Sequence, residues 1–164
     1  MIRSPAMLTA VTSYDIGNFI HVAAVIVALG APFAYAPFTA LAQSANPRAV
    51  PTVLRAMRRV DFAIVTPGMV LLLLAGIYML VDASISMGES WVSVGIAAII
   101  VLFAIVHGVV EPAVKRAIGV AERDLGQGGE LSAEYRALSR RINVAGAIAG
   151  IVVLVAAFFM VVKP

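Results

Sequence analysis

Four long stretches of the chain contain no Asp, Glu, Lys or Arg. They are residues 16–41, 62–81, 91–110 and 142–162. An α-helix needs about 20 consecutive apolar residues to cross the hydrocarbon core of a bilayer, and each stretch is at least that long. The pattern of apolar and charged positions therefore predicts four membrane-spanning helices.

These helices predict an all-α fold. The bilayer core offers no water, so a spanning segment must satisfy its backbone hydrogen bonds internally, as a helix does. The connections are short, which makes neighbouring helices antiparallel and predicts an up-down four-helix bundle. Residues 1–164 are expected to form a single membrane domain with spans at about 15–42, 60–82, 91–114 and 142–162.

The composition agrees with a membrane location. Apolar residues make up 62% of the chain, charged residues 13%, and the mean hydropathy is +1.00. A soluble domain averages about half apolar and a quarter charged residues, so this chain has too few polar side chains to cover a soluble protein. The lipid bilayer is therefore the expected partner. The chain has no cysteine, which excludes disulfides, thiolate catalysis and iron–sulfur clusters.

The basic residues predict an orientation. Ten of the twelve Lys and Arg lie in the first and third connections: Arg48, Arg55, Arg58, Arg59, Lys115, Arg116, Arg123, Arg136, Arg140 and Arg141. The middle connection, DASISMGES, has none. The positive-inside rule then places the basic connections in the cytoplasm and both termini outside, in a multi-pass protein of the cell membrane. The net charge of +3 reflects this asymmetry and does not indicate nucleic-acid binding.

His21 lies within the first apolar stretch. Helical spacing places Tyr14, Asn18 and His21 on one face, and a face with three polar groups should contact protein rather than lipid. Asn18 and Tyr14 could hydrogen-bond a structural His21 without any metal. Alternatively, the His21 imidazole and the thioethers of Met79 and Met160, near the outer ends of spans two and four, would suit heme iron or a cuprous ion.

A second polar cluster is expected at the inner ends of the spans. His107 and Glu111 are four residues apart on one helix face, and Asp61 and Arg59 begin span two at a comparable depth. Such a cluster could relay protons or hold a substrate, or it could be an ion-pair network that anchors the bundle. His107 should lie about 14 Å from His21 in depth, which argues against one heme held between the two histidines.

Proline and glycine positions predict irregularities within the spans. Pro32 and Pro37 should kink or loosen the inner half of the first helix. The TPG sequence that begins at Thr66 predicts a kink in the second, with the Thr66 hydroxyl bonded to a freed carbonyl. In span four, Gly146 and Gly150 form a small-xxx-small pair that would pack within the bundle or across a homodimer.

Two segments resemble a known family. FIHVAAVIVALGAPFAYAP is similar to the xxHxxxxxxxxG opening helix, and TPGMVLLLLAGIYML to the second span, of an uncharacterised family of four-span bacterial integral membrane proteins. That family distantly resembles copper-resistance-D-type domains and the heme-containing membrane protoporphyrinogen oxidase. The resemblance implies that His21 is the heme or metal ligand. The chain has valine and alanine where the oxidase has a tryptophan beside this histidine, and it lacks that enzyme's lysine within a span, which argues against oxidase activity.

Three hypotheses for function follow. The first is a redox protein that binds heme b through His21. The second is a non-catalytic structural or accessory subunit of a larger membrane complex, with no cofactor. The third is a copper or small-solute transport module that uses His21, Met79 and Met160. No nucleophile–base set, phosphate loop or zinc motif occurs in the sequence, which leaves open whether the protein is an enzyme.

Overall fold

The computed structural model describes residues 11–126 and 128–164. These residues form four long helices, each long and apolar enough to cross a membrane, at Ser13–Ala45, Pro47–Asp82, Ser90–Gly126 and Ala133–Val162. The predicted all-helical fold with four potential spans is confirmed, and each predicted span falls within one of these helices. The predicted outer N-terminus at residues 1–10, and Gln127 of the predicted inner turn, lie outside the described residues.

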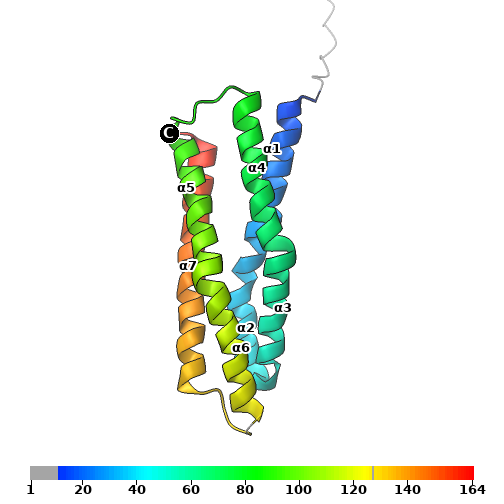
Figure 1. The fold of residues 1–164 in the computed structure, drawn as a ribbon, viewed down its shortest axis with the longest axis vertical. Coiled ribbons are helices and arrows are strands. Elements are labelled where there is room, and N and C mark those ends of the chain that lie inside the picture. The colour runs from blue at the N-terminus through cyan, green and yellow to red at the C-terminus, as the bar shows by residue number, and fades with distance from the viewer. Residues whose placement is uncertain (1–10, 127) are drawn as a thin grey trace, which may run out of the picture.

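The helices run up and down, so that residues 11 and 164 lie at the same end of the bundle (Figure 1). Most of the long helices consist of two α-helical parts. The first contains α1 (Ser13–Ala24) and α2 (Tyr35–Ala45), the second α3 (Val50–Val60) and α4 (Thr66–Asp82), and the third α5 (Ser90–Ile105) and α6 (Glu111–Gly126). The fourth is the single uninterrupted helix α7 (Ala133–Val162).

A π-helical segment lies between the two parts in each of the first three long helices, and in the first it is followed by a 3-10 helix, Ala31–Ala34. The segments are Val25–Leu29, Asp61–Val65 and Val106–Val110. A proline follows each segment within three residues: Pro32, Pro67 and Pro112. Proline lacks an N–H and clashes with the carbonyl four residues earlier, which lies inside the π-helical segment in every case. The wider turn accommodates that clash, so the irregularity predicted at Pro32 and Pro67 takes this form.

Two buried clusters hold the helices together. The first cluster lies toward the end opposite residues 11 and 164. It gathers around Tyr135 of α7, which is 1% exposed, and includes Leu54 of α3 and Ala117 of α6. The middle cluster gathers around Met69 of α4 and includes Ala28. The first two helices cross closely there, because a Cβ at Gly68 would lie only 2.6 Å from the Ala28 Cβ.

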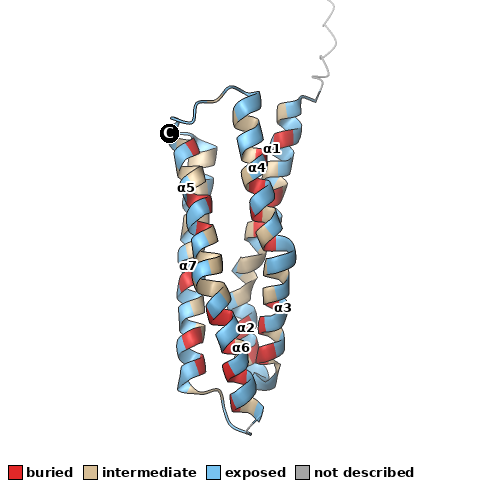
Figure 2. Ribbon diagram, viewed as in Figure 1, coloured by how far each residue is buried: buried red, intermediate tan, exposed pale blue. Residues whose placement is uncertain are grey.

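Large apolar side chains also cover much of the outer surface. Phe19 is 73% exposed, Leu74 57% and Ile151 62%, and exposed residues follow the outward faces of all four helices (Figure 2). Soluble monomers rarely expose so much contiguous apolar surface. The outward faces are therefore suited to contact with lipid acyl chains.

The helices separate into two pairs toward the end that contains residues 11 and 164. α1 packs along α4, and α5 packs along α7, whereas α4 and α5 make few contacts although only the loop 83–89 separates them in sequence. Figure 1 shows this loop crossing between the two pairs. The separation leaves the space in which the candidate site lies.

A candidate cofactor site around His21

A cavity of about 330 Å³ lies between the two helix pairs. All four long helices contribute to its walls, which are almost entirely apolar; Leu72, Leu80, Ile96, Ile99 and Ala156 are among the lining residues. The side chains with chemistry of their own are His21, Met79, Trp91 and Met160. A concave, mostly apolar space with a few polar groups is typical of a small-molecule site, and the volume lies near the lower end of the range for such sites.

The His21 ring has a defined hydrogen-bonding state. Its Nδ1 lies 3.0 Å from the backbone carbonyl oxygen of Leu72 in α4. A carbonyl can only accept, so Nδ1 must carry the proton and donate it. In the neutral imidazole, Nε2 then keeps its lone pair. Metal-binding histidines are commonly held in this way, with one ring nitrogen donating to a carbonyl and the other free to bind.

Gly76 makes room for this arrangement. A Cβ at Gly76 would lie 3.2 Å from Cε1 and 3.4 Å from Nδ1 of His21, closer than most side-chain contacts. The Leu72 carbonyl points along α4 toward residue 76, because helix carbonyls face the residue four positions later. The imidazole therefore reaches the Leu72 oxygen by occupying the space that a side chain at position 76 would take.

The two methionines also lie against glycines. A Cβ at Gly17 of α1 would lie 3.1 Å from Cγ of Met79, and a Cβ at Gly95 of α5 would collide with the terminal methyl of Met160. One imidazole and two thioethers thus line the same cavity, each beside a residue without a side chain. None of these three glycines was singled out from the sequence, because glycine is common in membrane helices.

The structure does not bring the whole predicted polar face to the cavity. Tyr14 is half-buried and Asn18 is exposed, and neither lines the cavity. Neither hydrogen-bonds His21, whose partner is the Leu72 carbonyl instead. The expectation that Asn18 or Tyr14 satisfies His21 is therefore replaced by a backbone acceptor on the neighbouring helix.

The donors that line the cavity restrict the kinds of metal that would fit. Within residues 11–126 and 128–164, no three His, Asp or Glu side chains gather closely enough to hold an ion. Hard cations such as Mg²⁺ and Ca²⁺ need several oxygen ligands. Imidazole and thioether are instead ligands of heme iron and of cuprous copper.

The inner polar cluster forms with a different arginine from the one predicted. The Tyr35 hydroxyl donates to Oδ1 of Asp61 at 2.9 Å. Glu111 pairs with Arg58 at 2.8 Å, whereas Arg59 is exposed.

Helical spacing would have identified Arg58. It follows Leu54, on the buried face of α3, by four residues, which places it beside that face, whereas Arg59 points away.

His107 does not line the cavity. Its ring stacks on Phe103 with a centroid separation of 5.6 Å. The cluster joins α2, α3 and α6 through a tyrosine–carboxylate hydrogen bond and an ion pair. This arrangement is typical of an ion-pair network that anchors the bundle, which was one of the two interpretations of this cluster drawn from the sequence.

Two further predictions concern the Thr66 hydroxyl and the glycine pair of span four. The predicted back-bond of Thr66 is wrong, because its hydroxyl oxygen is buried without a hydrogen-bond partner among the described residues. A Cβ at Gly150 would lie 3.3 Å from the Phe33 ring, so that this glycine packs within the chain. Gly146 is exposed, and a homodimer through it stays a prediction.

Fold and cavity together define an all-helical integral membrane protein whose four long helices surround an apolar site with one histidine. The chain belongs to the DUF2269 family, described as predicted integral membrane protein, because the model of that family matches residues 16–164. No curated protein and no solved structure matches the chain. The family match supports the resemblance to an uncharacterised family of membrane proteins that the sequence indicated.

Proposed function

We propose that the cavity binds heme b, with His21 as an axial ligand, and that the protein has a redox role in the cell membrane. The observation that carries the proposal is the hydrogen bond from Nδ1 of His21 to the Leu72 carbonyl, 3.0 Å long. It leaves the Nε2 lone pair on a side chain that lines an apolar cavity. The family that the first span resembles is distantly similar to the heme-containing membrane protoporphyrinogen oxidase, which favours the same ligand.

The shape and chemistry of the cavity favour heme over a bare ion. An ion needs only its ligands, whereas this cavity extends along α5 from Trp91 to Leu102, about 16 Å at the rise of an α-helix. Its apolar walls suit a flat macrocycle with an apolar face. A thioether is an established second ligand of histidine-ligated heme iron, and Met79 or Met160, which both line the cavity, would supply it.

The protein residues would have distinct roles around this group. Bound heme supplies one-electron redox chemistry. The Leu72 carbonyl fixes the orientation of the His21 ring and raises the basicity of Nε2. The apolar side chains exclude water, and both exclusion of water and a thioether ligand tune the reduction potential.

Copper binding is the second candidate, and it rests on the thioethers. His21, Met79 and Met160 line one cavity, and this set of one imidazole and two sulfurs suits a cuprous ion. The distant resemblance to copper-resistance-D-type domains favours the same metal. Under this alternative the protein would be a copper-handling or transport module.

An absorption spectrum of the purified full-length protein, expressed with heme available, tests the proposal together with a metal assay. We expect a Soret band and, after reduction with dithionite, sharp α and β bands. Stoichiometric copper without a chromophore would support the second candidate instead. A colourless protein without metal would contradict both and leave a structural histidine in an accessory subunit.

Methionine-to-leucine variants identify the second ligand. Leucine keeps the approximate volume of methionine, so Met160→Leu and Met79→Leu should preserve the packing. We expect one of them to convert a low-spin spectrum to a high-spin one while the heme content stays within about twofold of wild type, since His21 remains. If both variants keep a low-spin spectrum, neither methionine is a ligand.

We also propose that the cavity lies toward the outer side of the membrane. The ten basic residues of the two inner connections lie at the opposite end of the bundle, which the positive-inside rule places in the cytoplasm. Electron exchange with an external partner would then take place near the loop 83–89.

A further inference from the structure

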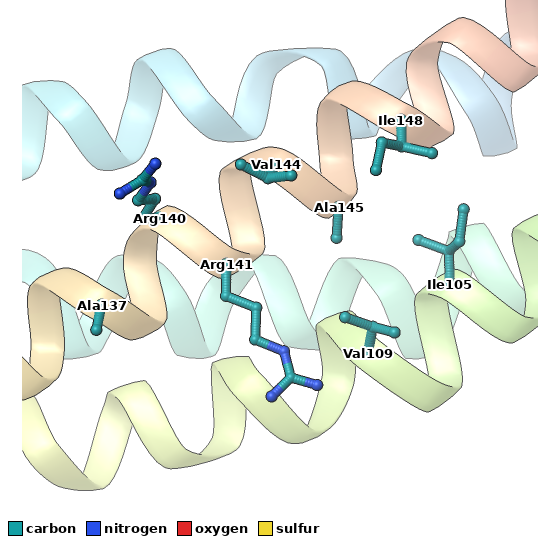
Figure 3. Close-up of a pocket in the computed structure, with 8 residues that line it drawn as sticks. All are labelled: Ile105, Val109, Ala137, Arg140, Arg141, Val144, Ala145 and Ile148. Carbon is teal, nitrogen blue, oxygen red and sulfur yellow. The ribbon is translucent and has the colours of Figure 1, made fainter.

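A hollow of about 420 Å³ lies on the side of the bundle and shares no lining residue with the His21 cavity. Its walls are formed by α7 and by the third long helix, with Ile105, Val109, Val144 and Ile148 among the lining residues. Figure 3 shows these apolar side chains gathered at one end of the hollow. Between them and Ala137, the Arg141 side chain extends from α7 toward the third long helix.

Two arginines border this hollow. Arg141 reaches across it, whereas Arg140 extends from the opposite flank of α7 (Figure 3). Both are exposed, and in the described part of the chain neither has an ion-pair partner. Arg58 and Arg123, in contrast, pair with carboxylates. The charge at the hollow is therefore free to meet an external anion.

The position of the arginines along α7 sets their depth. They are the last charged residues before the uncharged stretch 142–162. A helix of that length measures about 31 Å, close to the roughly 30 Å of the hydrocarbon core. Arg140 and Arg141 therefore lie at the level of the lipid headgroups, while Val144 and Ile148 lie one and two turns inside the hydrocarbon.

We propose that this hollow binds one anionic glycerophospholipid. The phosphate diester pairs with the guanidinium of Arg141, Arg140 adds a second positive charge at the same depth on the other flank of α7, and an acyl chain lies along Val109, Val144 and Ile148. Charge complementarity selects an anionic headgroup, since basic hollows between spanning helices at the headgroup level attract such lipids. The apolar end of the hollow selects a lipid over a free phosphate, because only a lipid also covers those side chains.

Competition between two lipids tests the proposal. Full-length protein is placed in nanodiscs of equal parts phosphatidylglycerol and phosphatidylcholine, extracted gently, and its retained lipids are counted by native mass spectrometry. We expect the wild type to retain phosphatidylglycerol selectively. Each basic residue near the surface contributes about 1 kcal/mol, so removal of both charges in R140Q/R141Q should lower that selectivity by at least roughly tenfold.

Matched variants separate this site from general charge effects. R140K/R141K keeps the charge and should keep most of the selectivity. R48Q/K115Q also removes two exposed positive charges at the same end of the bundle, away from the hollow, and should behave as wild type. Thermal unfolding without added lipid checks that all variants fold.

Two results would overturn the proposal. One is a selectivity for phosphatidylglycerol that R140Q/R141Q keeps at the wild-type level, or that R48Q/K115Q loses as much as R140Q/R141Q does. The other is displacement of the retained lipid by millimolar inorganic phosphate or glycerol phosphate, which would indicate a simple anion site without a role for the apolar walls.

Discussion

The contact between His21 and Gly76 is the structural feature on which the proposed site depends. The imidazole occupies the space of a missing side chain and reaches the Leu72 carbonyl behind it. The sequence identified His21 as a polar group that should face protein, because an apolar span seldom carries one without a reason. Its partner could not be predicted, since every helical residue has a carbonyl and none is marked by its side chain.

A methyl group at Gly76 should disturb the site. In Gly76→Ala the added Cβ would lie 3.2 Å from Cε1 of His21, so that the ring must move from its hydrogen bond. Loss of such a supporting hydrogen bond costs roughly 10–100-fold in metal affinity. We therefore expect the purified variant to retain at least about tenfold less heme, measured as Soret absorbance per protein.

Gly146→Ala is the matched control, because a Cβ at Gly146 meets no neighbouring atom within 4 Å. It should retain heme as the wild type does. Equal heme content in both alanine variants would show that the position of the imidazole does not depend on Gly76.

For the long helices, the sequence pattern predicts where a span lies better than it predicts the form of its irregular turns. The lack of charges in 142–162 was sufficient to locate span four. Of the predicted irregularities, those at Pro32 and Pro67 occur, whereas Pro37 lies in the regular α2 and the segment before Pro112 was not predicted. The form of those turns was not predicted, because a proline can be accommodated by a kink, a 3-10 turn or a π-helical segment. In the first helix, Ala28 of the π-helical segment lies against Gly68 of the second helix, a contact between segments that the proline positions do not predict.

The turn between α6 and α7 depends on Asp124. Its carboxylate accepts the backbone N–H of Ser132 at 3.0 Å and pairs with Arg123 at 3.0 Å. Ser132 in turn caps α7 by accepting from the N–H of Tyr135. The helix Ser90–Gly126 has 37 residues, about 55 Å, so this end projects beyond the roughly 30 Å hydrocarbon core into water.

Acid should weaken this turn. Hydrogen bonds from Ser132, with a smaller contribution from Arg123, hold the pKa of Asp124 below its ordinary value. A carboxyl whose pKa is lower in the folded protein stabilises it above the unfolded pKa, and that stabilisation is lost as the pH falls through the folded value. We expect thermal unfolding in detergent to occur at lower temperature as the pH drops below about 4.

Asp124→Asn isolates this contribution. The variant should unfold at lower temperature than the wild type at pH 7, and the difference between the two should shrink at acid pH. A difference that stays constant from pH 7 to pH 3 would contradict the role given to the charged carboxylate.

At the scale of the whole molecule, the order and approximate limits of the helices follow from the sequence, but the cavity does not. Short connections predicted that consecutive long helices would be neighbours. The first packs on the second and the third on the fourth, whereas α4 and α5 separate at the end that contains residues 11 and 164 (Figure 1). Close contacts at small residues, such as Gly17 against Tyr78 and Met79, hold α1 against α4. Apolar periodicity alone does not specify which helices pair.

The orientation of the bundle can be tested directly because the chain has no cysteine. Met87 in the loop 83–89 and Glu130 in the opposite connection are both exposed. In intact cells, a membrane-impermeant maleimide should label Met87→Cys and label Glu130→Cys only after the membrane is opened. The reverse pattern would place the His21 cavity toward the cytoplasm.

The measurement that most directly tests the central claim compares the two histidines. Reduced absorption spectra of His21→Gly and His107→Gly, both purified from cells with heme available, are recorded with and without added imidazole. The account predicts that His21→Gly loses the heme bands and regains them with imidazole, while His107→Gly matches the wild type. Wild-type heme bands in His21→Gly without imidazole would contradict the assignment of His21 as the ligand.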